Sequence, residues 1–150
     1  MITILAKAAL VVILPISSVT PGAINVNVTQ ANIKTTICTS GYTSTIRPPS
    51  NYTTELKKWQ LANTYKVFAN KNLSAYEEDH LISLEIGGNA IDPKNLWPEP
   101  YANPNGARVK DQIENKLHTL VCSGKMLLVT AQHLISTNWY AAYQQYVVKK

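Results

Sequence analysis

The sequence lacks the features that mark several specialised classes of protein. Its 150 residues suffice for one domain with a small extension and are too few for two independent hydrophobic cores. It contains no internal repeat and no heptad pattern, which excludes solenoids and coiled coils. Glycine and proline number only 6 and 8, so a collagen-like or low-complexity chain is also excluded.

Cysteine and charged residues are scarce as well. Neither of the two cysteines, Cys38 and Cys122, belongs to a CxxC pair, which argues against a cysteine-built zinc site. They could close one disulfide in an oxidising compartment or remain two separate buried thiols. Charged residues make up only 15% of the chain and hydrophobic residues 45%, which argues against disorder. The net charge of +5 favours approach to a polyanion without identifying one.

The first 23 residues carry no acidic side chain and are typical of a secretory signal. Lys7 is their only basic residue, an apolar run over 8–14 follows, and small residues close the segment at Gly22 and Ala23. The apolar run is shorter than the roughly 20 residues of a membrane-spanning helix. We therefore predict a secreted or periplasmic protein with no stable membrane insertion after removal of residues 1–23. The alternative is a buried N-terminal strand or helix.

Residues 24–75 form the first part of the predicted mature chain. They are rich in Thr, Ser, Asn and Pro, which predicts an extended, irregular segment. A helix is expected to open near Tyr52, with Thr53 as its cap and with Leu56 and Trp59 in its buried stripe. The basic side chains of this part are either ordinary solvated groups or a substrate-facing arm: Arg47, Lys57 and Lys58.

Residues 76–150 form the second part and carry the clearer patterns. Apolar residues alternate with polar ones over 81–86, which predicts a strand. A second short strand is expected at Leu96–Trp97, and the prolines that follow it are expected to stop further strand pairing. Apolar spacings of three and four residues predict an amphipathic helix over 107–122 and a packing helix over 130–146. Strands followed by helices indicate an α+β fold.

The order of motifs in this second part is similar to that of a known nuclease family. The pairs Asp79-His80, Gly87-Gly88, Asn95-Leu96 and Lys110-Asp111 follow one another at spacings comparable to the ββα-metal finger of the HNH endonuclease superfamily. The resemblance covers about residues 76–122. It implies a small ββα-metal hairpin plus helix core, preceded by the irregular N-terminal segment and followed by the C-terminal packing helix.

The resemblance also implies roles for individual residues. His80 is expected to act as the general base, since an unperturbed imidazole titrates at about pH 6.5. Asp79 is expected to hold Mg²⁺ or Mn²⁺, because carboxylates suit these hard cations. Asn95 is expected to brace the loop and orient His80. To these we add Lys110 and Arg108 as phosphate-binding partners.

The sequence departs from the family pattern at the second metal ligand. The family places a His or Asn at the start of the helix, where this chain has Gly106-Ala107, and neither residue offers a side-chain ligand. The substitutes nearby are Asn105, Asp111 and Glu114. We favour Asp111, because it follows Lys110 as an acidic residue does in many helices of the family.

The expected function is therefore a divalent-metal-dependent endonuclease that hydrolyses phosphodiester bonds in DNA or RNA. The sequence identifies no inhibitor or immunity partner. One alternative is a catalytically eroded HNH-like module that binds nucleic acid or an envelope partner without turnover. Another is a glycosidase-like carboxyl pair, drawn from Glu78 or Asp79 with Glu85 or Glu99, although no spacing supports a particular pair.

Overall fold

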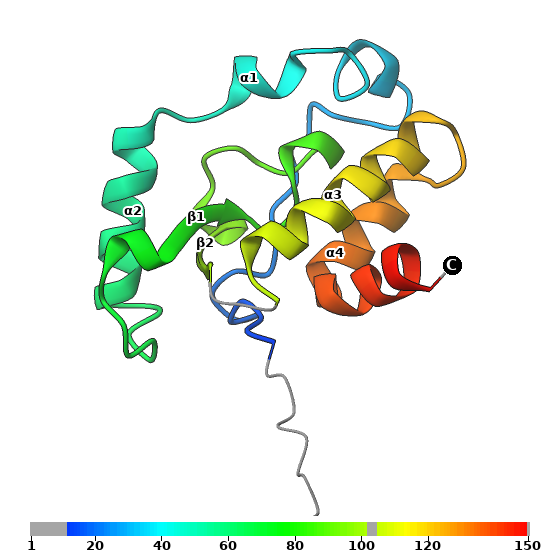
Figure 1. The fold of residues 1–150 in the computed structure, drawn as a ribbon. Helices are drawn as coiled ribbons and strands as arrows, with labels where there is room; N and C mark the ends of the chain where they lie inside the picture. Colours follow the sequence, from blue (N-terminus) through cyan, green and yellow to red (C-terminus); the bar gives the residue numbers. More distant parts are fainter. Residues whose placement is uncertain (1–11, 102–104, 150) are drawn as a thin grey trace, which may run out of the picture.

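The computed structural model describes residues 12–101 and 105–149, and Figure 1 shows their arrangement. The first eleven residues of the predicted signal lie outside the described residues. The helices and strands are α1 (Tyr42–Ile46), α2 (Ser50–Ala62), β1 (Tyr76–His80), β2 (Leu96–Pro100), α3 (Ala107–Cys122) and α4 (Leu128–Tyr143), and a π-helical turn over Gln144–Val148 follows α4. This mixture of helices with a two-stranded sheet confirms the predicted α+β class.

The β-hairpin lies at the centre, with α2 on one side and the α3–α4 pair on the other (Figure 1). Strands β1 and β2 pair antiparallel, with Asp79 opposite Trp97 and His80 opposite Leu96. Pro98 and Pro100 lie within β2, so the expectation that the prolines stop pairing is wrong. In a two-stranded sheet each strand has a free edge, and a proline without an N–H is tolerated where its nitrogen points to that edge.

The strand predicted over residues 81–86 is also wrong. Strand β1 ends at His80, and Leu84–Ile86 is a single 3-10 turn. Leu81 and Ile82 are both buried although they are adjacent, which the one-sided burial of a strand would not allow. The Asn95 side chain forms hydrogen bonds with the backbone N–H and carbonyl of Ile82, so neither group is available for pairing with a neighbouring strand.

The predicted helices are present, and α2 and α4 differ from the prediction in their boundaries. Helix α3 spans Ala107–Cys122 as expected, and Gly124 follows it with a φ of +74°. Helix α2 begins at Ser50, so Thr53 lies inside it and does not cap it. The Trp59 side chain on α2 is 54% exposed, so the prediction that it belongs to the buried stripe of this helix was wrong. Helix α4 begins at Leu128 and has a non-helical residue at position 138.

The hydrophobic core lies between the hairpin and helices α3 and α4, around the fully buried Trp97 and Trp139. The segment 12–23 packs against this core. Thr20 is fully buried, and its hydroxyl lies 2.8 Å from the Tyr65 hydroxyl. The boundary of the signal at residue 23 stays a prediction, and cleavage there would remove these contacts.

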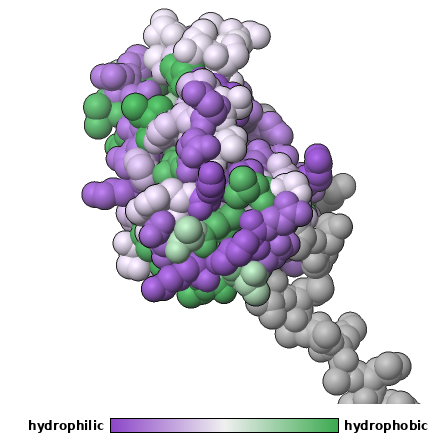
Figure 2. Space-filling view, turned by 90° about the vertical axis from the view of Figure 1, so that its left-hand side faces the viewer, coloured by the Kyte–Doolittle hydropathy of each residue, from purple (hydrophilic) through white to green (hydrophobic). Residues whose placement is uncertain are grey.

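A disulfide joins Cys38 to Cys122 and thereby ties the N-terminal segment to the end of α3. This pairing is the one expected for an oxidising compartment, which is extracellular or periplasmic. Within the described ranges, no helix combines the length and the apolar character that crossing a membrane requires. Figure 2 shows the face on the α2 side, where hydrophilic residues predominate and apolar residues are scattered among them.

Candidate functional site

A polar pocket of about 270 Å³ opens where the end of β1, the 3-10 turn, α3 and the link between α1 and α2 meet. Most of its lining side chains are polar or charged. The pocket is lined by Arg47, Glu77, Asp79, His80, Ser83, Leu84, Glu85, Asp111, Glu114 and Asn115. The structure therefore brings together the Asp79-His80 pair and the polar flank of the following helix, as the sequence predicts.

The orientation of His80 is set by a backbone carbonyl. Its Nε2 atom lies 2.9 Å from the carbonyl oxygen of Ala90. Because a carbonyl can only accept a hydrogen bond, Nε2 carries the proton and donates it. In the neutral ring the other nitrogen, Nδ1, then holds a lone pair. Burial lowers the pKa of His80 below its usual 6.5, so the ring is neutral at neutral pH.

Asn95 braces the loop that follows His80, as predicted. Its side chain is fully buried. The amide nitrogen donates to the carbonyls of Ile82 at 3.0 Å and Asn89 at 2.9 Å, and its oxygen accepts from the Ile82 N–H at 2.9 Å. Asn89 directly precedes Ala90, so Asn95 holds the segment whose carbonyl orients His80.

Lys110 of α3 lies beside the pocket and has no exposed surface. Its ammonium lies 2.6 Å from Oδ2 of Asp79 and 2.8 Å from the His80 carbonyl oxygen, and it also donates to Oε1 of Glu114. Glu114 is one helical turn further along α3, so the pair follows the i,i+4 geometry. The three acceptors use all three ammonium protons.

The charge of Lys110 governs the carboxyl groups around it. Burial by itself would raise the pKa of Asp79, but the Lys110 ammonium outweighs it and holds that pKa below its usual value. Burial raises the pKa of Glu114 to about 8 despite the same ammonium. Burial and the nearby Asp79 charge likewise raise the pKa of Glu99 well above its usual range. Asp79 therefore carries the negative charge, whereas Glu114 is largely protonated near neutral pH.

These residues do not fit the divalent ion that the resemblance implies. Within residues 12–101 and 105–149, only one set of three His, Cys, Asp or Glu side chains has its ligand atoms within 4.8 Å of one another. This set contains neither Asp79 nor another residue predicted to bind the metal. Oδ2 of Asp79 and Oε1 of Glu114 are bonded to the Lys110 ammonium. A dication at these oxygens would have to displace that ammonium or lie beside it.

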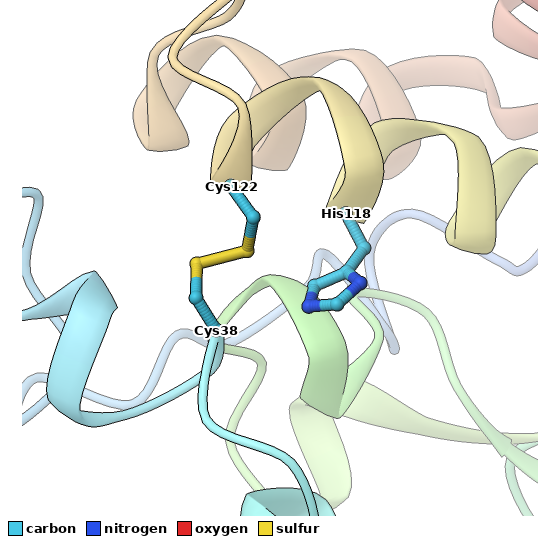
Figure 3. A group of neighbouring side chains, drawn as sticks. All are labelled: Cys38, His118 and Cys122. Atoms are coloured by element: carbon cyan, nitrogen blue, oxygen red, sulfur yellow. A yellow bond between two sulfur atoms is a disulfide. The ribbon is translucent and has the colours of Figure 1, made fainter.

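The group with converging ligand atoms consists of Cys38, His118 and Cys122, at the far end of α3 (Figure 3). Its two sulfurs are bonded to each other, so neither is the thiolate that a metal requires. The Nε2 atom of His118 lies 2.9 Å from the Ile37 carbonyl oxygen. In this oxidised form the group is a structural link between the N-terminal segment and α3.

The other predicted residues differ in their distance from the pocket. Asp111 lines it at an exposed position, whereas Asn105 is not among its lining residues. Arg108 is exposed and stacks over Tyr101, with 5.8 Å between the guanidinium carbon and the ring centroid. Lys110 has no free donor in this structure, so the phosphate contact predicted for it has no support.

Two residues beside or in the pocket had weaker signals in the sequence. Arg47 lines it from an exposed position, and its role as a substrate-facing group stays a prediction. Glu99 lies opposite Glu77 in the hairpin, and its carboxyl group is fully buried beside Asp79. The register of the two strands places Glu99 there, and no short motif marks it.

Comparisons with protein-family models, with curated proteins and with solved structures give no match.

Proposed function

We propose that this chain is an exported endonuclease that cleaves phosphodiester bonds in DNA or RNA, with neutral His80 as its general base. The observation that carries the proposal is the hydrogen bond from Nε2 of His80 to the Ala90 carbonyl, because it leaves Nδ1 as a proton acceptor on a residue that lines a polar pocket. Cleavage of a phosphodiester requires such a base to take a proton from the attacking oxygen.

The charges at the pocket suit a phosphate in spite of its many acidic side chains. Arg47 supplies a guanidinium, which pairs with two phosphate oxygens at once. Burial raises the pKa of Glu77 and that of Asp111 from their usual values, and it raises the pKa of Glu114 to about 8. The Glu114 carboxyl group is therefore largely protonated near neutral pH, and a neutral carboxyl group repels a polyanion less than an ionised one.

A second candidate function is the eroded module that binds nucleic acid or an envelope partner without turnover. The saturated Lys110 ammonium favours it, since Oδ2 of Asp79 is bonded to that group and a metal would compete with the ammonium for this oxygen. Binding that a chelator leaves unchanged, with no cleavage under any condition, would support this function over the first.

The experiment that separates the two incubates the purified full chain with plasmid DNA and with RNA, in Mg²⁺, in Mn²⁺ and in chelator. We expect cleavage, and we expect His80→Ala to lower its rate by about 100-fold or more. His133→Ala is the matched control, because His133 is exposed on α4 and does not line the pocket. Cleavage that survives His80→Ala at the full rate would reject the role of His80.

A further inference from the structure

We propose that the Lys110 ammonium is the fixed cation of this pocket, in place of a divalent metal, and that the pocket cleaves RNA without one. The proposal rests on the proposed function for its substrate, and on the contacts of Lys110 for its cation. It departs from the metal dependence that the resemblance to HNH endonucleases implies.

The contacts of Lys110 match those of a small bound cation. Its nitrogen is surrounded by three oxygens, which come from the Asp79 carboxylate, the Glu114 carboxyl group and the His80 carbonyl. Oxygen ligands of this kind are those that Mg²⁺ and Mn²⁺ prefer. The lysine side chain fills this place from α3 and is fully buried.

The charge of this group is permanent over the working range of pH. Burial by itself would lower the pKa of the lysine, but the charge of Asp79 outweighs it and raises that pKa, and Glu114 adds to this effect where it is ionised. A divalent ion at the same oxygens would face this ammonium at close range in a poorly solvated site. Like charges there repel strongly, so we expect the wild-type pocket to bind no divalent ion.

The absence of a metal-activated water restricts the substrate. A water molecule without a metal is a weak nucleophile, whereas RNA carries its own nucleophile in the 2′-hydroxyl group. In the step that we infer, the 2′-oxygen forms a bond to phosphorus while its proton passes to Nδ1 of His80. The bond from phosphorus to the 5′-oxygen breaks, and that oxygen takes a proton from a water molecule, whose hydroxide then takes the proton from Nδ1 and restores neutral His80. The products are a 2′,3′-cyclic phosphate and a 5′-hydroxyl end.

The cation assignment is tested by Mn²⁺ binding, followed by calorimetry and by the paramagnetic resonance of the free ion. We expect no saturable binding to the wild-type chain and one bound Mn²⁺ in Lys110→Met, where the three oxygens are free. The double variant Lys110→Met/Asp79→Asn should lose that site, and Lys116→Met, an exposed change on the same helix, should bind none.

The outcomes of this titration decide the assignment without any measurement of activity. One Mn²⁺ bound by the wild type and lost in Asp79→Asn would overturn it, and so would a folded Lys110→Met that binds none. If circular dichroism shows that Lys110→Met does not fold, Lys110→Gln replaces it. If neither folds, the wild-type titration decides, with saturable binding overturning the assignment and no binding supporting it.

The substrate class is tested by cleavage in chelator. We expect the wild type to cut single-stranded RNA and to leave DNA and 2′-O-methyl RNA of the same sequence intact. Cleavage of RNA or DNA only after addition of Mg²⁺ or Mn²⁺ would overturn this inference and leave the proposed nuclease standing. No cleavage of any substrate under any condition would overturn both the substrate class and the proposed function, while the Mn²⁺ titration would still decide the role of Lys110.

Discussion

The ammonium nitrogen of Lys110 lies 2.6 Å from Oδ2 of Asp79, and both groups are largely or wholly withdrawn from solvent. The two residues are 31 positions apart, so this ion pair joins α3 to the end of β1. It also fixes the backbone of His80, whose carbonyl accepts from the same ammonium. The position of the proposed base and the packing of α3 are therefore coupled.

Removal of this cation should destabilise the fold. In Lys110→Met the carboxyl groups of Asp79 and Glu114 lose their partner while they stay buried, and we expect a loss of about 3–5 kcal/mol in the free energy of unfolding. Urea unfolding at neutral pH measures it. Lys116→Met is the control and should stay within about 0.5 kcal/mol of the wild type. A loss below about 1 kcal/mol for Lys110→Met would contradict the account of the ion pair.

Asn95→Ala should also destabilise the chain and release His80. The change leaves the N–H and carbonyl of Ile82 and the carbonyl of Asn89 without their partner, at a cost of about 2–4 kcal/mol. The comparison variant is Asn63→Ala, whose amide makes one exposed bond to the Trp59 carbonyl. Equal effects of the two changes in urea unfolding would argue against the bracing role of Asn95.

The buried carboxyl group of Glu78 should lower the free energy of unfolding as the pH rises. Burial raises the pKa of its carboxyl group from 4.5 to about 9, and both of its oxygens lack a hydrogen-bond partner among the described residues. Between these two pH values the native state holds a proton that the unfolded chain releases, so the free energy of unfolding falls as the pH increases.

Glu78→Gln removes that titration, and we expect the fall in stability between about pH 4.5 and pH 9 to become shallower. Urea unfolding at a series of pH values measures the slope. Glu55→Gln, an exposed change on α2, should leave the slope as it is in the wild type. Parallel curves for the wild type and Glu78→Gln would show that this carboxyl group is not protonated in the native state.

The pH dependence of cleavage should follow His80. Burial lowers the pKa of His80 from 6.5, so the ring becomes protonated, and loses its capacity as a base, only below that value. We expect the rate to be level near neutrality and to fall on acidification below pH 6.5. A rate that rises towards acid pH would instead indicate a carboxyl group as the reacting acid, as in the glycosidase hypothesis.

The parts of the fold that the sequence predicted are those with strong periodicity. Helix α3 was predicted over its full length, because Val109, Ile113 and Leu117 recur at spacings of four residues on one face. The alternation over 81–86 was misleading, since it also fits a buried loop. The hydrogen bonds of Asn95 to Ile82 stabilise the loop in place of a strand. The two residues are 13 positions apart, and a contact of this kind produces no periodic pattern in the sequence.

The candidate site was predictable in its members and less so in their arrangement. The sequence marked Asp79, His80 and Asn95, and it placed Lys110 and Glu114 on one flank of α3. The burial of Lys110 between the two carboxyl groups follows from how α3 packs on β1, which the sequence pattern does not specify. The burial of Glu99 has the same origin, because it depends on the register of the hairpin.

The claim on which the functional account rests is the protonation state of the His80 ring, and ¹⁵N NMR of the imidazole measures it directly. The full chain, labelled at histidine, is compared with His80→Ala for assignment at a pH above 6.5. We predict a protonated Nε2 and an unprotonated Nδ1 for His80. A proton on Nδ1 instead would remove the acceptor from the proposed base and contradict the account.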